Sequence, residues 1–407
     1  MSEVVNIPQL RFPEFSGEWK EKLLKDLTKI NQGLQIPIAD RFTEEVENSY
    51  FYITNEFLKE SSSNKYFIQN PTESVLCTEN DVLMTRTGNT GQVVTNVNGA
   101  FHNNFFKIKY SGDLNKDFLV EFLRLGTTQN MILRYAGTST IPDLNHGDFY
   151  RLKLSLPSKT EQQKIAAFLS AVDTKIELLR QKQELLGEYK KGVMQQIFSQ
   201  AIRFKAGDGC DFPDWEEKKL GDIGHTFNGL TGKTKDDFGR GKSYIQYMQI
   251  FESSKINIDN FGLVDVLDDE NQKVAQYGDV FFTTSSETPD AVGYSSVLLD
   301  DIDNLYLNSF CFGFRPDSLN ELNPNFAQFL MRSTNFRKRV IRLAQGSTRY
   351  NMSKVQLMKE VVKLPCLEEQ TKIANFLSLI DNKIEQVGKK LDKSKQFKKA
   401  LLQQMFV

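Results

Sequence analysis

The chain has 407 residues, of which 40% are hydrophobic, and its 51 Lys and Arg residues against 52 Asp and Glu give a net charge of −1. This length predicts two or three domains, and the balanced charge excludes a protein that coats nucleic acid by charge alone. No apolar run approaches a membrane span, no secretory signal is visible, and four isolated cysteines with three histidines argue against a zinc site or a disulfide framework. We therefore expect a cytoplasmic chain with no membrane partner and no bound metal.

Residues 1–157 are predicted to form a mixed α/β globular segment. Three of its loops carry the side-chain types that contact base edges and phosphates. The candidates are Gln32, Gln35, Thr85, Arg86, Thr87, Asn89, Thr138, Ser139 and Thr140. Arg86 stands between two hydroxyl residues and can reach a guanine or a phosphate. The alternative is that it pairs with a nearby carboxylate.

Residues 158–200 are predicted to form one long helix. Ser158 and Glu161 have the spacing of a capping box directly after Pro157. Apolar residues then recur at intervals of three and four positions, as in the seam of a coiled coil. Some 40 helical residues at a rise of 1.5 Å each make a rod of about 60 Å.

Residues 201–365 are predicted to form a second mixed α/β globular segment with its own polar loops. Its candidates are Lys233, Lys235, Arg240, Lys242, Ser285, Ser286, Ser347, Thr348, Arg349, Tyr350 and Asn351. Tyr247 and Phe251 are expected to pack in a core, whereas Gln246 or Gln249 can face a nucleic acid. Glu287 is expected to be a structural partner, because an acid close to phosphates is repelled.

Three short stretches of the second segment imitate catalytic motifs but miss their spacing. "GLTGKT" (229–234) has Phe227 where a phosphate-binding loop needs its first glycine. "NPNF" (323–326) has one proline too few for an adenine methyltransferase motif. "PDWEEK" (213–218) places its two acids too close together for a nuclease. We therefore predict no catalytic residue in this chain.

Residues 366–407 are predicted to form a second long helix that repeats the first. Lys164 begins "KIAAFLSAVDTKIE", and Lys372, 208 positions later, begins "KIANFLSLIDNKIE". At this offset, 156–199 and 364–407 share about 20 identities in 44 pairs. The chain is thus a duplication in which the helices are preserved and the globular segments have diverged.

The seam of such a long helix needs a long partner, and the other copy is the obvious one. If a two-fold axis relates the two halves, the helices run antiparallel as a coiled coil with pseudo-two-fold symmetry. Two globular readers on a rigid spacer would suit duplex DNA, since they could read two half-sites on either side of an unread gap. Because the readers differ in sequence, the half-sites should differ too.

The helical motifs, together with "NDVLMTRTGNTG" (80–91), "GDVFFTTSSETP" (278–289) and "GSTRYNMSKVQLMKEVVKLP" (346–365), resemble the specificity subunit of type I restriction-modification enzymes. The resemblance covers essentially the full length and includes the duplication. It implies an α+β protein with two target-recognition domains (1–157 and 201–365) and two conserved spacer helices (158–200 and 366–407).

The same resemblance implies a function and a set of partners. Each recognition domain would read one half of a bipartite, asymmetric site in double-stranded DNA. The helices would set the gap and dock two modification subunits, which bind S-adenosylmethionine and methylate adenine, and restriction subunits would add ATP- and Mg²⁺-dependent translocation and cleavage. This chain would hold no cofactor and have no catalytic role. The alternative from another class is a coiled-coil adaptor without DNA recognition.

Overall fold

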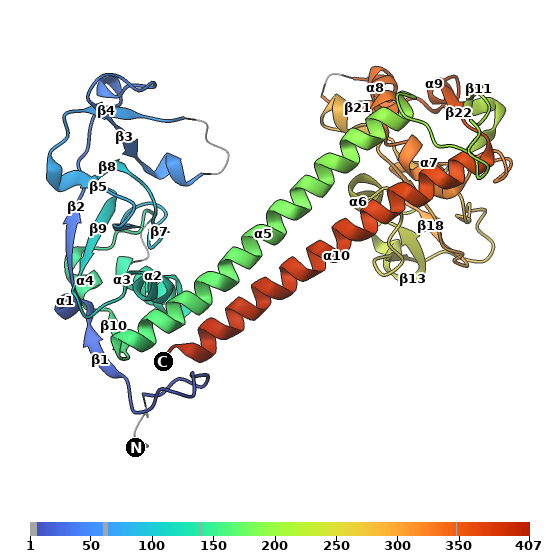
Figure 1. Ribbon diagram of the computed structural model, residues 1–407. Helices are drawn as coiled ribbons and strands as arrows, with labels where there is room; N and C mark the ends of the chain where they lie inside the picture. The colour runs from blue at the N-terminus through green and yellow to red at the C-terminus, as the bar shows by residue number, and fades with distance from the viewer. Residues whose placement is uncertain (1–5, 60–63, 138–139, 347) are drawn as a thin grey trace. The chain divides into compact units, whose positions relative to one another are not determined.

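The computed structural model describes residues 6–59, 64–137, 140–346 and 348–407. The chain divides into two compact units, of which unit 1 comprises residues 1–180 and 389–407, and unit 2 comprises residues 181–388. Both are mixed α/β units, as expected, and each contains a part of both long helices (Figure 1). Within the described ranges, none of the helices combines the length and the apolar character that a membrane crossing requires.

Unit 1 is built on two four-stranded sheets. The first has the order β2-β9-β6-β7, is antiparallel throughout and consists of Thr28–Gln32, Phe105–Tyr110, Val82–Thr85 and Val93–Val94. The second has the order β4-β3-β8-β5 and consists of Phe67–Gln69, Ser49–Ile53, Gly99–Phe101 and Leu76–Cys77. A separate ladder joins β1 (Lys20–Leu23) to β10 (Lys153–Leu156), directly before the long helix.

The shorter helices of unit 1 cover the first sheet. The long helix α5 (Lys159–Phe198) follows them in the chain, directly after β10. The shorter ones are α1 (Leu24–Leu27), α2 (Lys116–Arg124), α3 (Gly126–Ala136) and α4 (His146–Tyr150), with the 3-10 turns Ile38–Asp40, Asn55–Leu58 and Glu73–Val75. One core contains residues of the sheet, of α2 and of α5, among them Phe106, Phe118 and Leu169, none of which has exposed surface.

Unit 2 repeats this arrangement and adds a small sheet. The main sheet, β12-β19-β15-β17, consists of Gly224–Asn228, Cys311–Pro316, Val280–Thr283 and Ser295–Val297. A second sheet, β14-β13-β18, consists of Gly262–Val264, Phe238–Ile245 and Tyr306–Leu307, and a third, β16-β21-β20, of Ser285–Ser286, Tyr350–Met352 and Ala344–Gln345. The ladder of β11 (Glu216–Lys219) with β22 (Val361–Leu364) again stands before the long helix α10 (Leu367–Met405).

The shorter helices of unit 2 are α6 (Tyr247–Glu252), α7 (Pro324–Leu330), α8 (Thr334–Arg342) and α9 (Lys354–Leu357), with the 3-10 turns Leu220–Asp222, Lys235–Asp237 and Pro289–Ala291. Three of these helices, α7 to α9, follow the same order as α2 to α4 of unit 1, whereas α6 has no α-helix at the equivalent place. The pair α7–α8 corresponds to α2–α3, since Phe118 of α2 and Phe326 of α7 are 208 positions apart and both are fully buried. The repeat seen in the sequence therefore extends into the globular segments.

In each unit, a part of α5 runs antiparallel to a part of α10. Within unit 2, Gln183 lies against Gly388, where an added Cβ would come within 2.9 Å of the Gln183 Nε2 atom, and Lys190 forms an ion pair of 2.6 Å with Asp381. Residue numbers rise from Gln183 to Lys190 along α5 and fall from Gly388 to Asp381 along α10, so the two helices are antiparallel. Unit 1 has the counterpart of this ion pair, because Lys398 Nζ is 2.7 Å from Asp173 Oδ2. The same acid–lysine pair thus fixes the register of the helices in both units.

Both ends of α5 depart from the simplest sequence expectation. The Glu161 N–H donates to Ser158 Oγ at 3.3 Å, so half of the predicted capping box exists. The Glu161 carboxylate binds Arg11 instead of the Ser158 N–H, since a guanidinium offers two charge-assisted bonds. At the other end, Gln200 adopts a φ of 62°, and the N–H groups of Gln200 and Ala201 close a Schellman motif without a glycine.

Candidate nucleic-acid interface

The predicted loop Thr85–Asn89 forms the turn between β6 and β7. Thr85 is completely buried, and its hydroxyl donates to the Asn89 carbonyl and accepts from the Gln92 N–H at 2.9 Å. Gly88 and Gly91 supply the positive φ values of 87° and 91° that the turn requires. Thr85 therefore shapes the turn from inside, while Asn89 lies on its exposed side.

Arg86 and Thr87 converge on one carboxylate, that of Asp143. The Arg86 Nη2 atom is 2.6 Å from Asp143 Oδ2, and the Thr87 hydroxyl donates to Asp143 Oδ1. The Arg86 guanidinium also lies 5.6 Å from the centre of the Phe106 ring, and its side chain is 19% exposed. The alternative foreseen for Arg86, pairing with a nearby carboxylate, is thus what the structure shows. Sequence reasoning did not single out Asp143.

The remaining candidates of unit 1 occupy two further loops. The Gln32 amide donates to the Asn103 carbonyl at 3.1 Å, and the Asn103 amide donates to Gln35 Oε1 at 3.1 Å, so one bridge ties both glutamines to the β8–β9 turn. Gln35 and Thr140 are exposed. Two further candidates, Thr138 and Ser139, lie outside the described residues.

In unit 2, the basic cluster between Lys233 and Lys242 is matched by acids of the same unit. Lys233 forms an ion pair with Glu270, Arg240 Nε is 3.3 Å from Asp265 Oδ2, and Lys242 Nζ is 2.8 Å from Asp268 Oδ1. Lys235 is exposed in its 3-10 turn.

The hydrogen bond from Lys233 lowers the pKa of the Glu270 carboxyl to about 2, and the bond from Lys242 lowers the pKa of Asp268. Three of the four predicted cations therefore have their charge balanced by neighbouring acids of the chain itself.

A hollow of about 460 Å³ brings together polar and apolar side chains from four stretches of unit 2. It is lined by Tyr247, Met248, Phe251, Ser285, Ser286, Glu287, Thr288, Ala291, Phe310 and Arg349. Of the predicted residues, Ser285, Ser286 and Arg349 meet here. Met248 and Phe310, which the sequence did not indicate, are 50% and 59% exposed at this hollow.

Strand pairing places the remaining candidates of unit 2 close to this hollow. Ser285 pairs with Asn351 and Ser286 with Tyr350, and the Tyr247 hydroxyl donates to the Ser285 carbonyl at 2.7 Å. Thr348 is exposed beside them, and Ser347 lies outside the described residues.

Gln249 does not face outward, because it is buried and its amide donates to the Asn260 carbonyl. Helix α6 instead directs Tyr247 and Phe251 to the hollow, where the two rings stack with centroids 6.4 Å apart. Core packing is expected for these two residues. Both are partly buried, and Tyr247 packs against the core cluster that contains Ile245 and Leu307.

The two units use the same bridge with different chemistry. Thr87 bridges to Asp143 in unit 1, and Ser285 bridges to Asn351, 208 positions after Asp143, in unit 2. The first bridge carries a charged Arg–Asp pair and the second only neutral groups. Aligning the two halves at this offset could have found Asp143 from the sequence.

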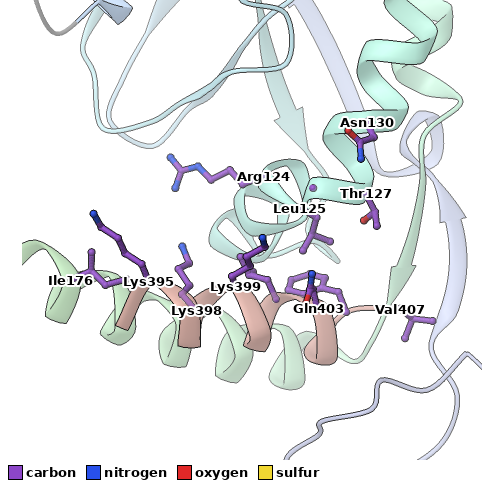
Figure 2. Close-up of a pocket in the computed structure, with 13 residues that line it drawn as sticks. Arg124, Leu125, Thr127, Asn130, Ile176, Lys395, Lys398, Lys399, Gln403 and Val407 are labelled. Atoms are coloured by element: carbon purple, nitrogen blue, oxygen red, sulfur yellow. The ribbon is translucent and has the colours of Figure 1, made fainter. Parts of the chain in front are cut away.

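A second cavity, of about 770 Å³, lies in unit 1 between the C-terminal part of α10 and the turn that joins α2 to α3. Figure 2 shows Lys395, Lys398 and Lys399 extending from α10 toward Arg124 and Leu125. Lys398 is neutralised by Glu121 at 3.1 Å and by Asp173. A smaller counterpart of about 220 Å³ in unit 2 is lined by Lys190, Lys191 and Arg332, among others.

The stretches that imitate catalytic motifs have structural roles. Asn323 caps α7 by accepting from the Phe326 N–H, and Trp215 donates from Nε1 to Glu369 at 3.1 Å. Lys233 of "GLTGKT" belongs to the ion pair with Glu270. Among the described residues, no group of three or more His, Cys, Asp and Glu side chains could hold a metal ion.

Comparison with known protein families finds one family, which matches two separate stretches of the chain. The family described as "Type I restriction modification DNA specificity domain" matches residues 16–188 and again residues 213–393. The specificity subunit of the type I restriction enzyme MjaVIII from Methanocaldococcus jannaschii is 26% identical over 97% of this chain and 92% of its own.

Solved structures agree in fold. The S subunit of a type I restriction-modification system from M. genitalium superposes with a TM-score of 0.61 at 17% identity, over 98% of this chain and 99% of that chain. A structure on complex assembly and conformational transition of the type I R-M system gives a TM-score of 0.54 at 18% identity, over 95% and 97%. The two family matches cover most of the chain and fall one on each half of the repeat. The chain belongs to the type I restriction-modification DNA specificity family.

Proposed function

We propose that this chain is the DNA sequence-specificity subunit of a type I restriction-modification enzyme. Each globular segment reads one half of a bipartite site in double-stranded DNA, and the chain itself carries out no catalytic step. One observation supports this above all others: the equivalent bridges Thr87–Asp143 and Ser285–Asn351 stand on the same scaffold but present different polar groups. A pair of readers with a common fold and different contact chemistry is what an asymmetric bipartite site requires.

The chemistry of each loop group suits base recognition. In unit 2, Arg349 and Ser286 offer hydrogen bonds beside the exposed Phe310 and Met248, and such apolar groups can contact a thymine methyl. In unit 1, Asp143 can accept from a cytosine amino group, and Arg86 can donate to a guanine once a base competes for the carboxylate. Because Thr85 is buried, we assign it to shaping the turn and leave it out of the contact set.

We further propose that two modification subunits bind, one to each unit. Tyr189 on α5 and Phe397 on α10 are 208 positions apart, both are 53% exposed, and each is followed by two lysines. Large exposed aromatic side chains are typical anchors of protein interfaces. A surface that is present once in each unit fits two copies of one partner. S-adenosylmethionine would belong to the modification subunits, and ATP and Mg²⁺ to restriction subunits.

The rival proposal, a coiled-coil adaptor without DNA recognition, explains the repeated aromatic surface equally well. It gives no reason for the hollow that gathers Arg349, Ser286, Met248 and Phe310 at the edge of unit 2. The two proposals differ in whether a DNA sequence is read, and that can be measured.

The test is genome-wide adenine methylation in cells that express this chain with its cognate modification subunit. We expect one methylated motif with two unequal defined halves and a fixed undefined gap. A host lacking this chain, but containing the modification subunit, is the control and should show no such motif. If the complex assembles with a competent methyltransferase and still no motif appears, the adaptor is the correct reading.

A further inference from the structure

Two adjacent polar side chains are buried in the first turn of each long helix. They are Glu161 and Gln162 in α5, and Glu369 and Gln370 in α10, and none of the four is more than 1% exposed. Burying a carboxylate or an amide is costly unless its hydrogen bonds are made. An exposed helix is stable without a buried polar pair. The hydrogen bonds that these four side chains make therefore indicate what the pairs do.

Each glutamine joins three parts of the chain. Gln162 donates to the Asp113 and Pro157 carbonyls, each at 3.0 Å, and accepts from the Asn115 N–H at 2.8 Å. The loop from Asp113 to Asn115 leads into α2 of the first globular segment, and Pro157 directly follows β10. One side chain therefore fixes the helix to the globular segment that precedes it.

Gln370 repeats the arrangement bond for bond. It donates to the Glu321 and Pro365 carbonyls at 2.9 Å and accepts from the Asn323 N–H at 2.9 Å. Asn323 caps α7, as Asn115 caps α2. The three bonds of the glutamine are therefore the same in both halves, although the two globular segments differ in sequence.

The glutamates bind the segment that leads into each globular part. Glu161 receives a bidentate pair from Arg11 at 2.7 and 2.9 Å, and Arg11 also donates to the Gly17 carbonyl at 2.5 Å. Glu369 accepts two hydrogen bonds from the Arg203 guanidinium, from Nε at 3.2 Å and from Nη2 at 2.8 Å. The hydrogen bonds that each arginine donates to its glutamate raise the pKa of the arginine, so the guanidinium stays charged.

Aromatic rings pack together at the same junction. In unit 1, Phe118 stacks on Phe406 at 5.0 Å and Trp19 lies 6.1 Å from Phe118. The counterparts in unit 2 are Phe326, Phe198 and Trp215, with centroid distances of 5.7 to 6.4 Å. Each junction thus combines buried hydrogen bonds with packed aromatic rings, and in unit 2 Trp215 joins the two by donating from Nε1 to Glu369.

We propose that the two Glu-Gln pairs are positioning residues that fix the orientation of each globular segment on its own helix, and thereby restrict the enzyme to one gap length. This inference rests on the proposed reading of a bipartite site. One added base pair moves a half-site by about 3.4 Å and turns it by about 35° around the DNA axis. A junction that could swing would accept such a site, whereas a rigid junction rejects it.

The first test compares Gln162→Leu with the wild-type chain, co-expressed with the modification subunit, by genome-wide methylation. Leucine keeps the size and the helix propensity but removes all three bonds. We expect both half-site sequences to be retained, while methylation at sites with one base pair more or fewer in the gap rises about tenfold relative to correct sites, which corresponds to about 1.4 kcal/mol of lost discrimination between gap lengths.

The matched control is Ile108→Ala, which removes a fully buried side chain from β9 and leaves the junction bonds in place. A merely structural role of Gln162 would make both variants lose methylation at all sites alike, with the gap unchanged. That outcome, or a Gln162→Leu chain with the wild-type gap, would overturn the proposal. Absence of a bipartite motif in the wild type would instead reject the proposed function.

A second measurement works without methylation. Spin labels at Glu73→Cys and Lys175→Cys, both exposed sites of unit 1, report the distance between the globular segment and α5, after Cys210→Ser and Cys366→Ser remove the exposed native thiols. We expect one narrow distance distribution in this background, a broader one with Gln162→Leu added, and no broadening with Ile108→Ala. Equal widths for all three chains would show that Gln162 does not position the segment.

Discussion

The ion pair with Asp143 limits the contacts that Arg86 of the first globular segment can make with DNA. The sequence identified Arg86 and Thr87 by type, but side-chain type does not reveal a partner 57 positions away. The structure shows a preformed Arg–Asp ion pair. On DNA binding, this pair must either separate or contact the bases with both of its side chains. In unit 2, Arg349 lines an open hollow and is exposed, so the stronger expectation concerns this residue.

We expect Arg349→Ala to relax the second half-site at one base position, because a good side-chain contact to a base contributes about 1–3 kcal/mol of discrimination. Methylome sequencing of the variant should show one degenerate position and an unchanged first half. Arg342→Ala, an exposed arginine in α8 of the same unit, is the control and should leave the motif intact. A uniform loss of methylation without relaxed sequence would assign Arg349 to phosphate binding.

At the level of elements, the long helices were predictable because their signals are local. Apolar spacing, Pro157 and the capping serine gave the start, and the absence of proline gave the length. The strands were not drawn from the sequence, since most have two to six residues and their pairing joins distant parts of the chain. The register of the helix pair depends on Lys190–Asp381 and Lys398–Asp173, which no local pattern reveals.

The exposed aromatic residues on these helices give a prediction about assembly. Phe397→Ser should reduce the complex from two modification subunits to one, and adding Tyr189→Ser should abolish binding, because truncating an interface anchor costs about 2 kcal/mol or more. Native mass spectrometry counts the subunits directly. Leu379→Ser, which removes a 61% exposed apolar side chain where the other half of the repeat has Ala171, is the control. Two bound subunits in the double variant would place the docking surface elsewhere.

At the level of the whole molecule, the duplication was the decisive feature of the sequence. It predicts two globular segments, two helices and two different recognition surfaces. It could not show which loop residues share a hollow, because Met248, Phe310 and Arg349 come together only through the fold. Nor could it show that Lys233, Arg240 and Lys242 are balanced by acids of their own unit.

The central claim is that each globular segment reads its own half of the site. The most direct test replaces residues 1–157 with the first segment of another family member, keeps Glu161 and Gln162, and determines the methylated motif. The account predicts that the first half of the motif changes to that of the donor while the second half and the gap stay as they were. A motif in which both halves change, or neither does, would contradict it.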